Sequence, residues 1–217
     1  MGSTAEPLPT TTTTTAGPVR IRKARPSDAS AVATLGAAVF SSTFENSGCT
    51  PEQLQQYLSE SYTPDAIAKD IADPDKELLV AVDRPTPTPT PTPNPGPASG
   101  DSDPGLDHPD GTILGFTLMT RGSHLHEPSV RHLEAPVELQ RLYVGLGQHG
   151  RGVGRALAEA VVEMAREEGF KHMWLGVWEE NHRAQKIYGK MGFVRIGEHV
   201  FDVGGDLQTD HIMFKAL

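Results

Sequence analysis

The chain has 217 residues, which is enough for one domain or a small pair of domains. Its formal net charge at pH 7 is -9, so we expect neither nucleic acid nor an anionic membrane as a partner, and a cationic partner suits it better. The one cysteine of the sequence, Cys49, leaves no intrachain disulfide and no cysteine-based metal site.

The start of the sequence lacks the apolar core of a secretory signal, and no apolar run is long enough to cross a bilayer. We therefore expect a cytoplasmic protein. Two Thr/Pro-rich segments, residues 1–18 and 84–110, lack the apolar content that offsets the entropy lost on ordering, so both are predicted to be disordered. Residues 19–217 are then expected to form a single α/β domain that carries the 84–110 insert.

The first half of this domain pairs short apolar patterns with helix-capping residues. Val19–Lys23 alternates and is predicted to be a strand. A cap at 27–28 is expected to start a helix that runs to about Phe40. Thr50-Pro51 and Thr63-Pro64 each place a capping residue before a proline, which is a favoured helix start. Two more helices are therefore predicted before the next strand.

The second half predicts most of the sheet. Strands at 78–82 and 112–120 are expected to form an antiparallel hairpin whose tip carries the insert. The later elements are predicted in the order strand, helix, strand, helix, strand, strand, at residues 137–144, 151–168, 173–177, 181–191, 193–201 and 209–215. The first helix of that series is a crossover connection, so the two strands flanking it should be parallel neighbours. The whole order predicts an α/β fold with a mostly antiparallel mixed sheet, one parallel strand pair and helices on both faces.

A glycine-rich turn, residues 148–155, stands at the start of the helix predicted at 151–168. Backbone N–H groups and partial positive charge at a helix N-terminus favour an anion such as a phosphate. A literal G-x-G-x-x-G at 145–150 also suggests a dinucleotide-binding fold. We reject that interpretation because the preceding strand, 138–144, is polar and alternating, whereas the first strand of such a fold is buried on both faces.

The turn resembles the pyrophosphate signature of the GNAT superfamily of acyl-CoA-dependent N-acyltransferases. That signature is Gln/Arg-x-x-Gly-x-Gly/Ala, and Gly152 and Gly154 match its two small positions. His149 stands at the leading position, and Gln148 lies one residue earlier, which departs from the signature. The resemblance implies a backbone cradle for a diphosphate from Gly150 onward.

A second family signature lies downstream. Asn181, Ala184 and Tyr188, followed by Gly192-Phe193, match it closely. The segment Leu142-Tyr143-Val144 matches the strand whose backbone runs along pantetheine in this superfamily. The resemblance implies a GNAT-like fold and acetyl-CoA as cosubstrate. It implies cofactor contacts at Leu142, Tyr143, Val144, His149, Gly150, Arg151, Gly152, Val153, Gly154, Arg155, Asn181 and Ala184.

A narrower resemblance, to PaiA-type polyamine N-acetyltransferases, covers roughly 19–217 apart from the insert. It is carried by Phe44, Gln53-x-x-x-Tyr57-Leu58, the run Leu175–Asn181, Gly197-x-His199-x-Phe201, and Gly205–Asp210. It implies transfer of an acetyl group to a primary amine by direct attack in a ternary complex, with spermidine or spermine as the first candidate acceptor. Amino acids, peptides, proteins and xenobiotic amines stay open as alternatives.

The expected chemistry needs a base and an acid. An alkyl amine has a pKa of about 10, so its deprotonation at pH 7 costs about 4 kcal/mol. Glu138, on the central strand, is the first candidate for the base, with Asp210 and Glu198 as weaker ones. Tyr188 can give a proton to the departing thiolate. The N–H of Val144 would meet the tetrahedral oxyanion if the strand bulges there.

Carboxylates along a groove would hold a polyamine, and Glu45 and Asp210 are the candidates besides Glu138. No metal site is expected, because the histidines of 124–132 stand in a loop without a nearby cysteine. Nothing marks a base beside Cys49, so we do not expect an acyl-enzyme on it. The rival hypothesis is a non-catalytic acyl-CoA-binding regulatory module, and a homodimer stays open.

Overall fold

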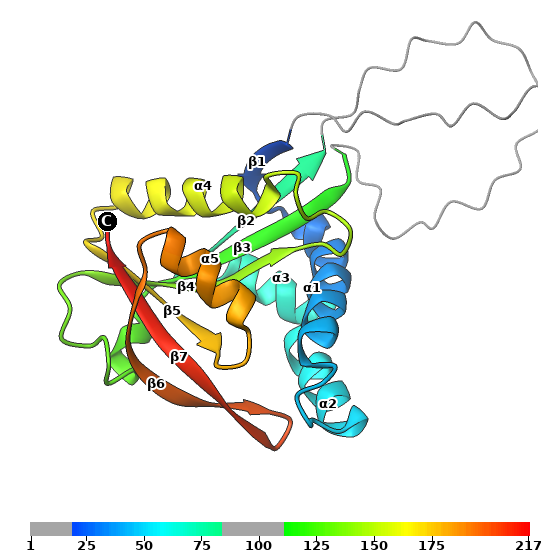
Figure 1. The fold of residues 1–217 in the computed structure, drawn as a ribbon. Coiled ribbons are helices and arrows are strands. Elements are labelled where there is room, and N and C mark those ends of the chain that lie inside the picture. The colour runs from blue at the N-terminus through cyan, green and yellow to red at the C-terminus, as the bar shows by residue number, and fades with distance from the viewer. Residues whose placement is uncertain (1–18, 84–110) are drawn as a thin grey trace, which may run out of the picture.

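The computed structural model describes residues 19–83 and 111–217, and both segments predicted to be disordered lie outside the described residues. The elements in chain order are β1 (Val19–Lys23), α1 (Ala29–Phe44), α2 (Pro51–Ser61), α3 (Pro64–Ala72), β2 (Lys76–Asp83), β3 (Ile113–Thr120), β4 (Pro136–Val144), α4 (Val153–Glu167), β5 (His172–Trp178), α5 (His182–Lys190), β6 (Val194–Val203) and β7 (Asp206–Ala216) (Figure 1). Short 3-10 turns lie at Pro26–Asp28 and Ser123–His126. Among the described residues, no helix has the length and apolar character needed to span a bilayer.

The strands form one seven-stranded sheet in the order β1-β2-β3-β4-β5-β7-β6. All neighbours are antiparallel except β4 and β5, which are parallel. One hydrophobic core packs α1, α2 and α3 against one face of the sheet, and a second core packs α4 and α5 against the other face (Figure 1). The predicted mixed sheet, its single parallel pair and the helices on both faces are confirmed.

The predicted helix caps hold at three of four helices. The side chains of Thr50, Thr63 and Asn181 each accept a hydrogen bond from a backbone N–H in the first turn of their helix. The carboxylate of Asp28 instead bonds Arg22 and the backbone N–H of Arg25. It therefore ties β1 to the start of α1 and does not cap that helix by its side chain.

Two helices differ from their predicted bounds. Helix α1 continues to Phe44 instead of ending near Phe40, because both rings pack into the core and stack with their centroids 4.4 Å apart. Helix α4 begins at Val153 instead of 151, because Gly150 and Gly152 have φ angles of +83° and +79°, which a right-handed helix cannot hold.

The parallel strands β4 and β5 pair over only three positions. Their pairing ends at Glu138 and Trp174, after which β5 continues beside β7 and β4 continues beside β3. A bulge in β4 at Gln140, which the register skips, accompanies this separation. The two strands therefore open into a gap in the middle of the sheet, and this gap positions the candidate site.

Candidate active site

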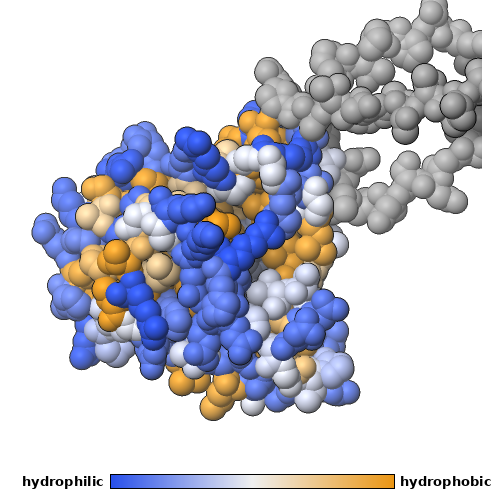
Figure 2. Space-filling view, in the orientation of Figure 1, coloured by the Kyte–Doolittle hydropathy of each residue, from blue (hydrophilic) through white to orange (hydrophobic). Residues whose placement is uncertain are grey.

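A cleft of about 1690 Å³ fills the gap between β4 and β5 and extends to the N-terminus of α4. Its walls come from β4, β5, α1, α4, α5 and the β6–β7 hairpin. The face seen in Figure 2 is mainly hydrophilic, with apolar side chains in small separate groups. A cleft of this size with a polar rim suits an elongated polar ligand.

The N-terminus of α4 forms one end of the cleft. Gly147, Gly150 and Gly152 have φ angles between 78° and 83°, so the turn folds back and leads into the helix. Gly152 occupies the N-cap position and has no side chain to accept from the first-turn N–H groups, unlike the caps of α2, α3 and α5. Those N–H groups are available to a phosphate.

The glycine at position 154 allows α4 to lie close to β4. A Cβ atom built at this position would lie 3.1 Å from Cγ2 of Val144, which is tighter than ordinary contact. The first turn of α4 and the end of β4 therefore lie side by side. A ligand whose phosphates sit on the helix can continue directly along the strand.

The two basic residues of the turn, which are predicted to contact the phosphates of the cofactor, differ in where their side chains lie. The guanidinium of Arg151 bonds Asp83 at 3.2 Å and also Gln148, and its side chain does not line the cleft. Arg155 does line the cleft, and its Nε donates to Glu159 at 2.7 Å. The expectation for Arg151 is wrong because the facing carboxylate at the end of β2 holds the guanidinium outside the cleft. The other residues expected to contact the cofactor all line the cleft.

The end of β4 offers backbone groups to the gap without a bulge at Val144. That residue pairs regularly with Gly115, and the N–H of Gly145 donates to the carbonyl of Leu114 at 2.9 Å. The oxyanion contact of Val144 is predicted above on the condition that the strand bulges there, and that condition is not met, because the glycine at 115 lets β3 and β4 stay in close register to the end. N–H groups along a strand alternate between its two edges, so the N–H of Val144 points away from β3 and toward the gap.

Tyr188 lines the cleft from α5, and Asn181 fixes the start of that helix. The carbonyl oxygen of the Asn181 side chain accepts from the N–H of Ala184 at 3.1 Å. The Tyr188 ring packs edge-on against Phe193 with centroids 5.8 Å apart. Burial, with a smaller contribution from Tyr143, raises the pKa of Tyr188, so its hydroxyl stays protonated at neutral pH.

Glu138 lines the cleft at the point where β4 and β5 separate. Burial raises the pKa of its carboxyl group, and a hydrogen bond from Ser123 and the charges of His199 and Arg141 oppose that shift. A carboxylate in this setting is a stronger base than an exposed one. Asp210 also lines the cleft, so two of the predicted carboxylates face it.

We call this part of the cleft, lined by Tyr57, Glu138, Gly176, His199 and Asp210, the acceptor end. Two predicted carboxylates lie outside it. Glu45 follows α1 and borders a separate shallow hollow, because α1 runs one turn longer than predicted. Glu198 pairs with Arg195 at 2.6 Å on the opposite side of β6 from His199, as strand alternation requires.

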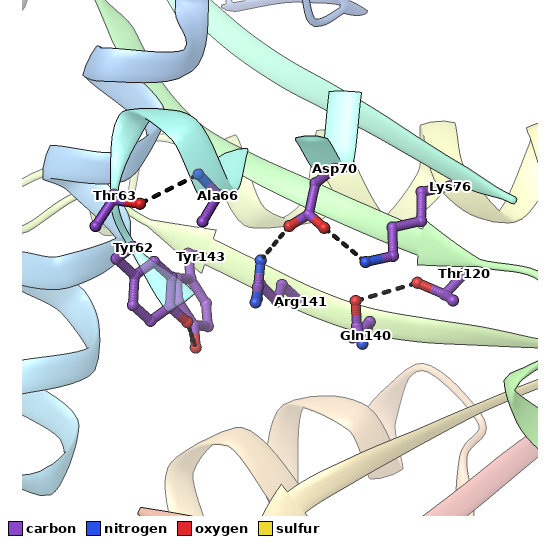
Figure 3. A network of polar contacts seen from close by, with 9 residues as sticks. All are labelled: Tyr62, Thr63, Ala66, Asp70, Lys76, Thr120, Gln140, Arg141 and Tyr143. Carbon is purple, nitrogen blue, oxygen red and sulfur yellow. Dashed lines mark hydrogen bonds and ion pairs between the residues drawn. The ribbon is translucent and has the colours of Figure 1, made fainter. Parts of the chain in front are cut away.

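The wall beside Glu138 holds a polar network that the sequence did not indicate (Figure 3). The hydroxyls of Tyr62 and Tyr143 are 2.7 Å apart, and the guanidinium of Arg141 lies 5.1 Å from the centroid of the Tyr62 ring. Arg141 also donates to Asp70 at 2.9 Å, and Asp70 binds Lys76 at 2.6 Å. The bulge at Gln140 is what brings Arg141 to the same face of β4 as Glu138.

Aromatic rings close the acceptor end. Phe40 stacks on Tyr57 with centroids 4.4 Å apart, and Phe44 stacks on Trp178 at 4.8 Å. Phe201 meets Tyr57 edge-on at 5.5 Å. Of these, Phe44, Tyr57, Trp178 and Phe201 belong to the pattern that carries the narrower resemblance, but nothing in the sequence indicated that they meet. Ring faces beside carboxylates suit a cationic chain.

A histidine lies beside Asp210. Nδ1 of His199 is 2.9 Å from Glu127, and Nε2 is 3.7 Å from Asp210. The contact with Asp210 raises the pKa of His199, burial opposes it, and Glu127 raises it further. In the part of the chain that the structure describes, no three His, Cys, Asp or Glu side chains are placed to hold a metal ion.

Comparison with known proteins gives one family. The family model described as Acetyltransferase (GNAT) family matches residues 105–193. An uncharacterized N-acetyltransferase of Mycobacterium tuberculosis is 35% identical over 108 residues, which is 50% of this chain and 63% of the relative. The match therefore spans less than two thirds of that curated relative.

Solved structures share the fold over nearly the whole chain. The PaiA N-acetyltransferase of Thermoplasma acidophilum, in complex with coenzyme A, has a TM-score of 0.61 at 18% identity and covers 92% of this chain and 99% of its own. A protein of Salmonella typhimurium, solved with its cofactor acetyl-CoA, has a TM-score of 0.59 at 15% identity and covers 93% and 95%. The chain thus has the GNAT fold.

Proposed function

We propose that this chain belongs to the GNAT superfamily and is an acetyl-CoA-dependent N-acetyltransferase that acts on a primary amine of a small molecule. The observation that carries this proposal is the continuity of one cleft, from the uncapped N-terminus of α4, along the free edge of β4, to the acceptor end. That shape matches a ligand with phosphates at one end and a reactive group at the other.

The proposed binding of acetyl-CoA follows the cleft. The diphosphate lies on the first-turn N–H groups from Gly152 to Arg155, where the helix dipole favours negative charge. The pantetheine amides pair with the free edge of β4 at Leu142 and Val144, as a short extra strand would. This placement directs the thioester toward Glu138 and Tyr188, which line the cleft on either side of that edge.

The proposed reaction is direct transfer. The amine nitrogen, after losing a proton with Glu138 as the base, attacks the thioester carbonyl carbon. The N–H of Val144 stabilises the oxyanion of the tetrahedral intermediate. As the C–S bond breaks, the hydroxyl of Tyr188 donates its proton to the leaving thiolate.

We further propose that the acceptor is a polyamine such as spermidine or spermine. Glu138 and Asp210 place negative charge at the acceptor end, and Tyr57, which stacks on the buried Phe40, provides an aromatic wall for an aliphatic cation. The cationic Arg141, which also lines the cleft, favours an amine carrying a carboxylate, such as an amino acid, as the second candidate.

The test is a thiol-release assay with acetyl-CoA and a panel of amines, run beside calorimetry with coenzyme A. We expect binding of coenzyme A, and turnover fastest with spermidine or spermine. Fastest turnover with amino acids would replace the polyamine by the second candidate. Binding of coenzyme A without turnover on any amine would favour a non-catalytic binding module, and no binding at all would overturn the whole proposal.

A further inference from the structure

The reaction proposed above releases a proton at a buried place. Protonated amine enters and neutral amide leaves, so one proton must reach solvent in each cycle. Glu138 is half-buried in the cleft, and burial raises the pKa of its carboxyl group, so it holds that proton more tightly than an exposed carboxyl would. A side chain that connects the acceptor end with solvent would speed release of the proton.

His199 is placed to make that connection. Its side chain is 35% exposed, whereas those of Glu127 and Asp210 are 7% and 14% exposed. Its charge acts on Glu138, and both residues line the same cleft. The imidazole therefore reaches both the acceptor end and the surface.

A hydrogen bond at one of its two nitrogens fixes the orientation of the His199 ring. A carboxylate only accepts hydrogen bonds, so Nδ1 of His199 carries the hydrogen in the 2.9 Å bond to Glu127. Glu127 is itself held by the N–H of Ser129 at 2.9 Å. Nε2 is then the atom that gains and loses a proton, with the ring held in one tautomer.

The space in front of Nε2 is kept open by a glycine. A Cβ atom built on Gly176 would lie 3.5 Å from Nε2 of His199 and 3.0 Å from Oδ2 of Asp210. Any larger residue on β5 would fill the volume that these two groups face. An amino group can lie there between Asp210 and the imidazole.

We propose that His199, positioned by Glu127, is the group that carries the amine's proton from the acceptor end to solvent. The inference rests on the proposed N-acetyltransferase function and adds a step to it. His199 is the relay, and Glu127 is a positioning residue that acts through it. Asp210 binds the incoming ammonium of the substrate and gives up its contact with the imidazolium of His199.

The protons balance as follows. The substrate ammonium carries three protons. The first passes through Glu138 to Nε2 of His199 and leaves to water. The second leaves the nitrogen of the tetrahedral intermediate and restores Tyr188, whose own proton has gone to the sulfur of coenzyme A. The third stays on the amide. One N–C bond forms and one C–S bond breaks.

The groups that face His199 decide when it can accept a proton. Asp210 on β7 and Glu127 on the preceding loop both raise its pKa, and burial opposes them. Glu138 on β4 adds further negative charge. Without substrate these carboxylates favour the charged imidazole, and an ammonium bound at Asp210 removes one of the groups that hold its proton. Binding of the amine should thus release a proton.

The experiment uses the full chain with coenzyme A bound and spermidine as the probe. Calorimetry in two buffers of different ionisation enthalpy counts the protons released on spermidine binding, and steady-state kinetics with acetyl-CoA gives the pH profile of kcat. We expect the wild type to release a proton, and His199→Gln to release none and to lose about 100-fold in kcat, as expected for loss of a proton-transfer group. Coenzyme A affinity should not change.

Three variants make the result specific to proton transfer. His199→Gly should regain activity when imidazole is added, which a structural role would not produce. Glu127→Gln removes a charge that raises the pKa of His199, so the rising limb of the pH profile should move to lower pH. His172→Gln is the matched control, because its Nδ1 also bonds a protein oxygen, Glu134 O at 2.8 Å, but the residue does not line the cleft.

The outcomes separate this inference from the function on which it rests. Wild-type turnover, with His199→Gln keeping the wild-type kcat and pH profile, would overturn the relay and leave the acetyltransferase intact. No turnover of the wild type on any amine would overturn both. Equal proton release by the wild type and His199→Gln would also overturn the relay, whatever the kinetics.

Discussion

Tyr62 and Tyr143 lie 81 residues apart in the chain, and their hydroxyls are joined by a hydrogen bond of 2.7 Å (Figure 3). The first residue ends α2 and the second lies on β4, so the bond ties the helical side of the cleft to its central strand. Burial raises the pKa of Tyr143 to about 12, so this pair stays neutral over the physiological range.

Replacing Tyr143 by Phe should therefore destabilise the fold. The hydroxyl of Tyr62, on a residue only 6% exposed, would lose its partner, at a cost of about 1–2 kcal/mol. Urea denaturation of both single variants and of the double variant measures the coupling. The double variant should be less destabilised than the sum of the two singles, and strict additivity would show that the bond does not stabilise the protein.

The N-terminus of α4 offers a prediction with a control on the same helix. Gly152→Ala strains a residue with φ of +79° and disturbs the turn before the first-turn N–H groups, so we expect coenzyme A to bind about tenfold more weakly. Gly169→Ala strains a residue with φ of +87° just after the helix, again with open space around the added Cβ. Both variants should lose similar stability, but only the first should lose affinity in calorimetry. Equal loss of affinity would argue against the anion site.

Tyr188→Phe should separate turnover from binding. Without the hydroxyl, the thiolate leaves unprotonated, so kcat should fall about 100-fold while coenzyme A affinity and thermal stability stay close to wild type. Thiol-release kinetics and calorimetry on the same preparation check this. A parallel loss of kcat and affinity would mean that the hydroxyl contributes to binding of coenzyme A instead of donating a proton.

Gly176→Ala should act on the amine alone. The added Cβ would meet Asp210 at 3.0 Å, so we expect the KM for spermidine to rise about tenfold and coenzyme A affinity to stay unchanged. Gly189→Ala on α5 is the control, because a Cβ there meets nothing within 4 Å and alanine favours a helix. An unchanged KM would place the acceptor elsewhere in the cleft.

Stability should depend on pH through His199. Its pKa is raised above the ordinary 6.5, chiefly by Asp210, with burial opposing and Glu127 adding to the shift. The folded state thus binds the proton more tightly than the unfolded state. This stabilisation is fully present below about pH 6.5 and is lost as pH rises through the folded pKa. The difference in unfolding free energy between the wild type and His199→Gln should shrink across that window. A difference that grows with pH would contradict the assignment.

The sequence predicted what depends on neighbouring residues. The caps at Thr50, Thr63 and Asn181 and the glycine turn before α4 are local signals, because each depends on groups within a few positions. The crossover helix was enough to predict that β4 and β5 are parallel. Most of the residues predicted to contact the cofactor from these signals line the cleft.

Contacts between distant segments could not be predicted in this way. The bulge at Gln140 depends on the register between β3 and β4, and it decides that Arg141 faces the cleft. Arg151 is held by Asp83, which ends a different strand. The contact between His199 and Glu127 joins residues 72 positions apart, and no periodicity in the sequence reports such a pair.

The three-position pairing of β4 with β5 has a consequence beyond catalysis. Past Glu138 no backbone ladder joins β4 to β5, so a bound pantetheine chain would add hydrogen bonds between the two halves of the sheet. A ligand that binds only the folded chain raises its free energy of unfolding, so the occupied protein should resist thermal unfolding and proteolysis better than the empty one.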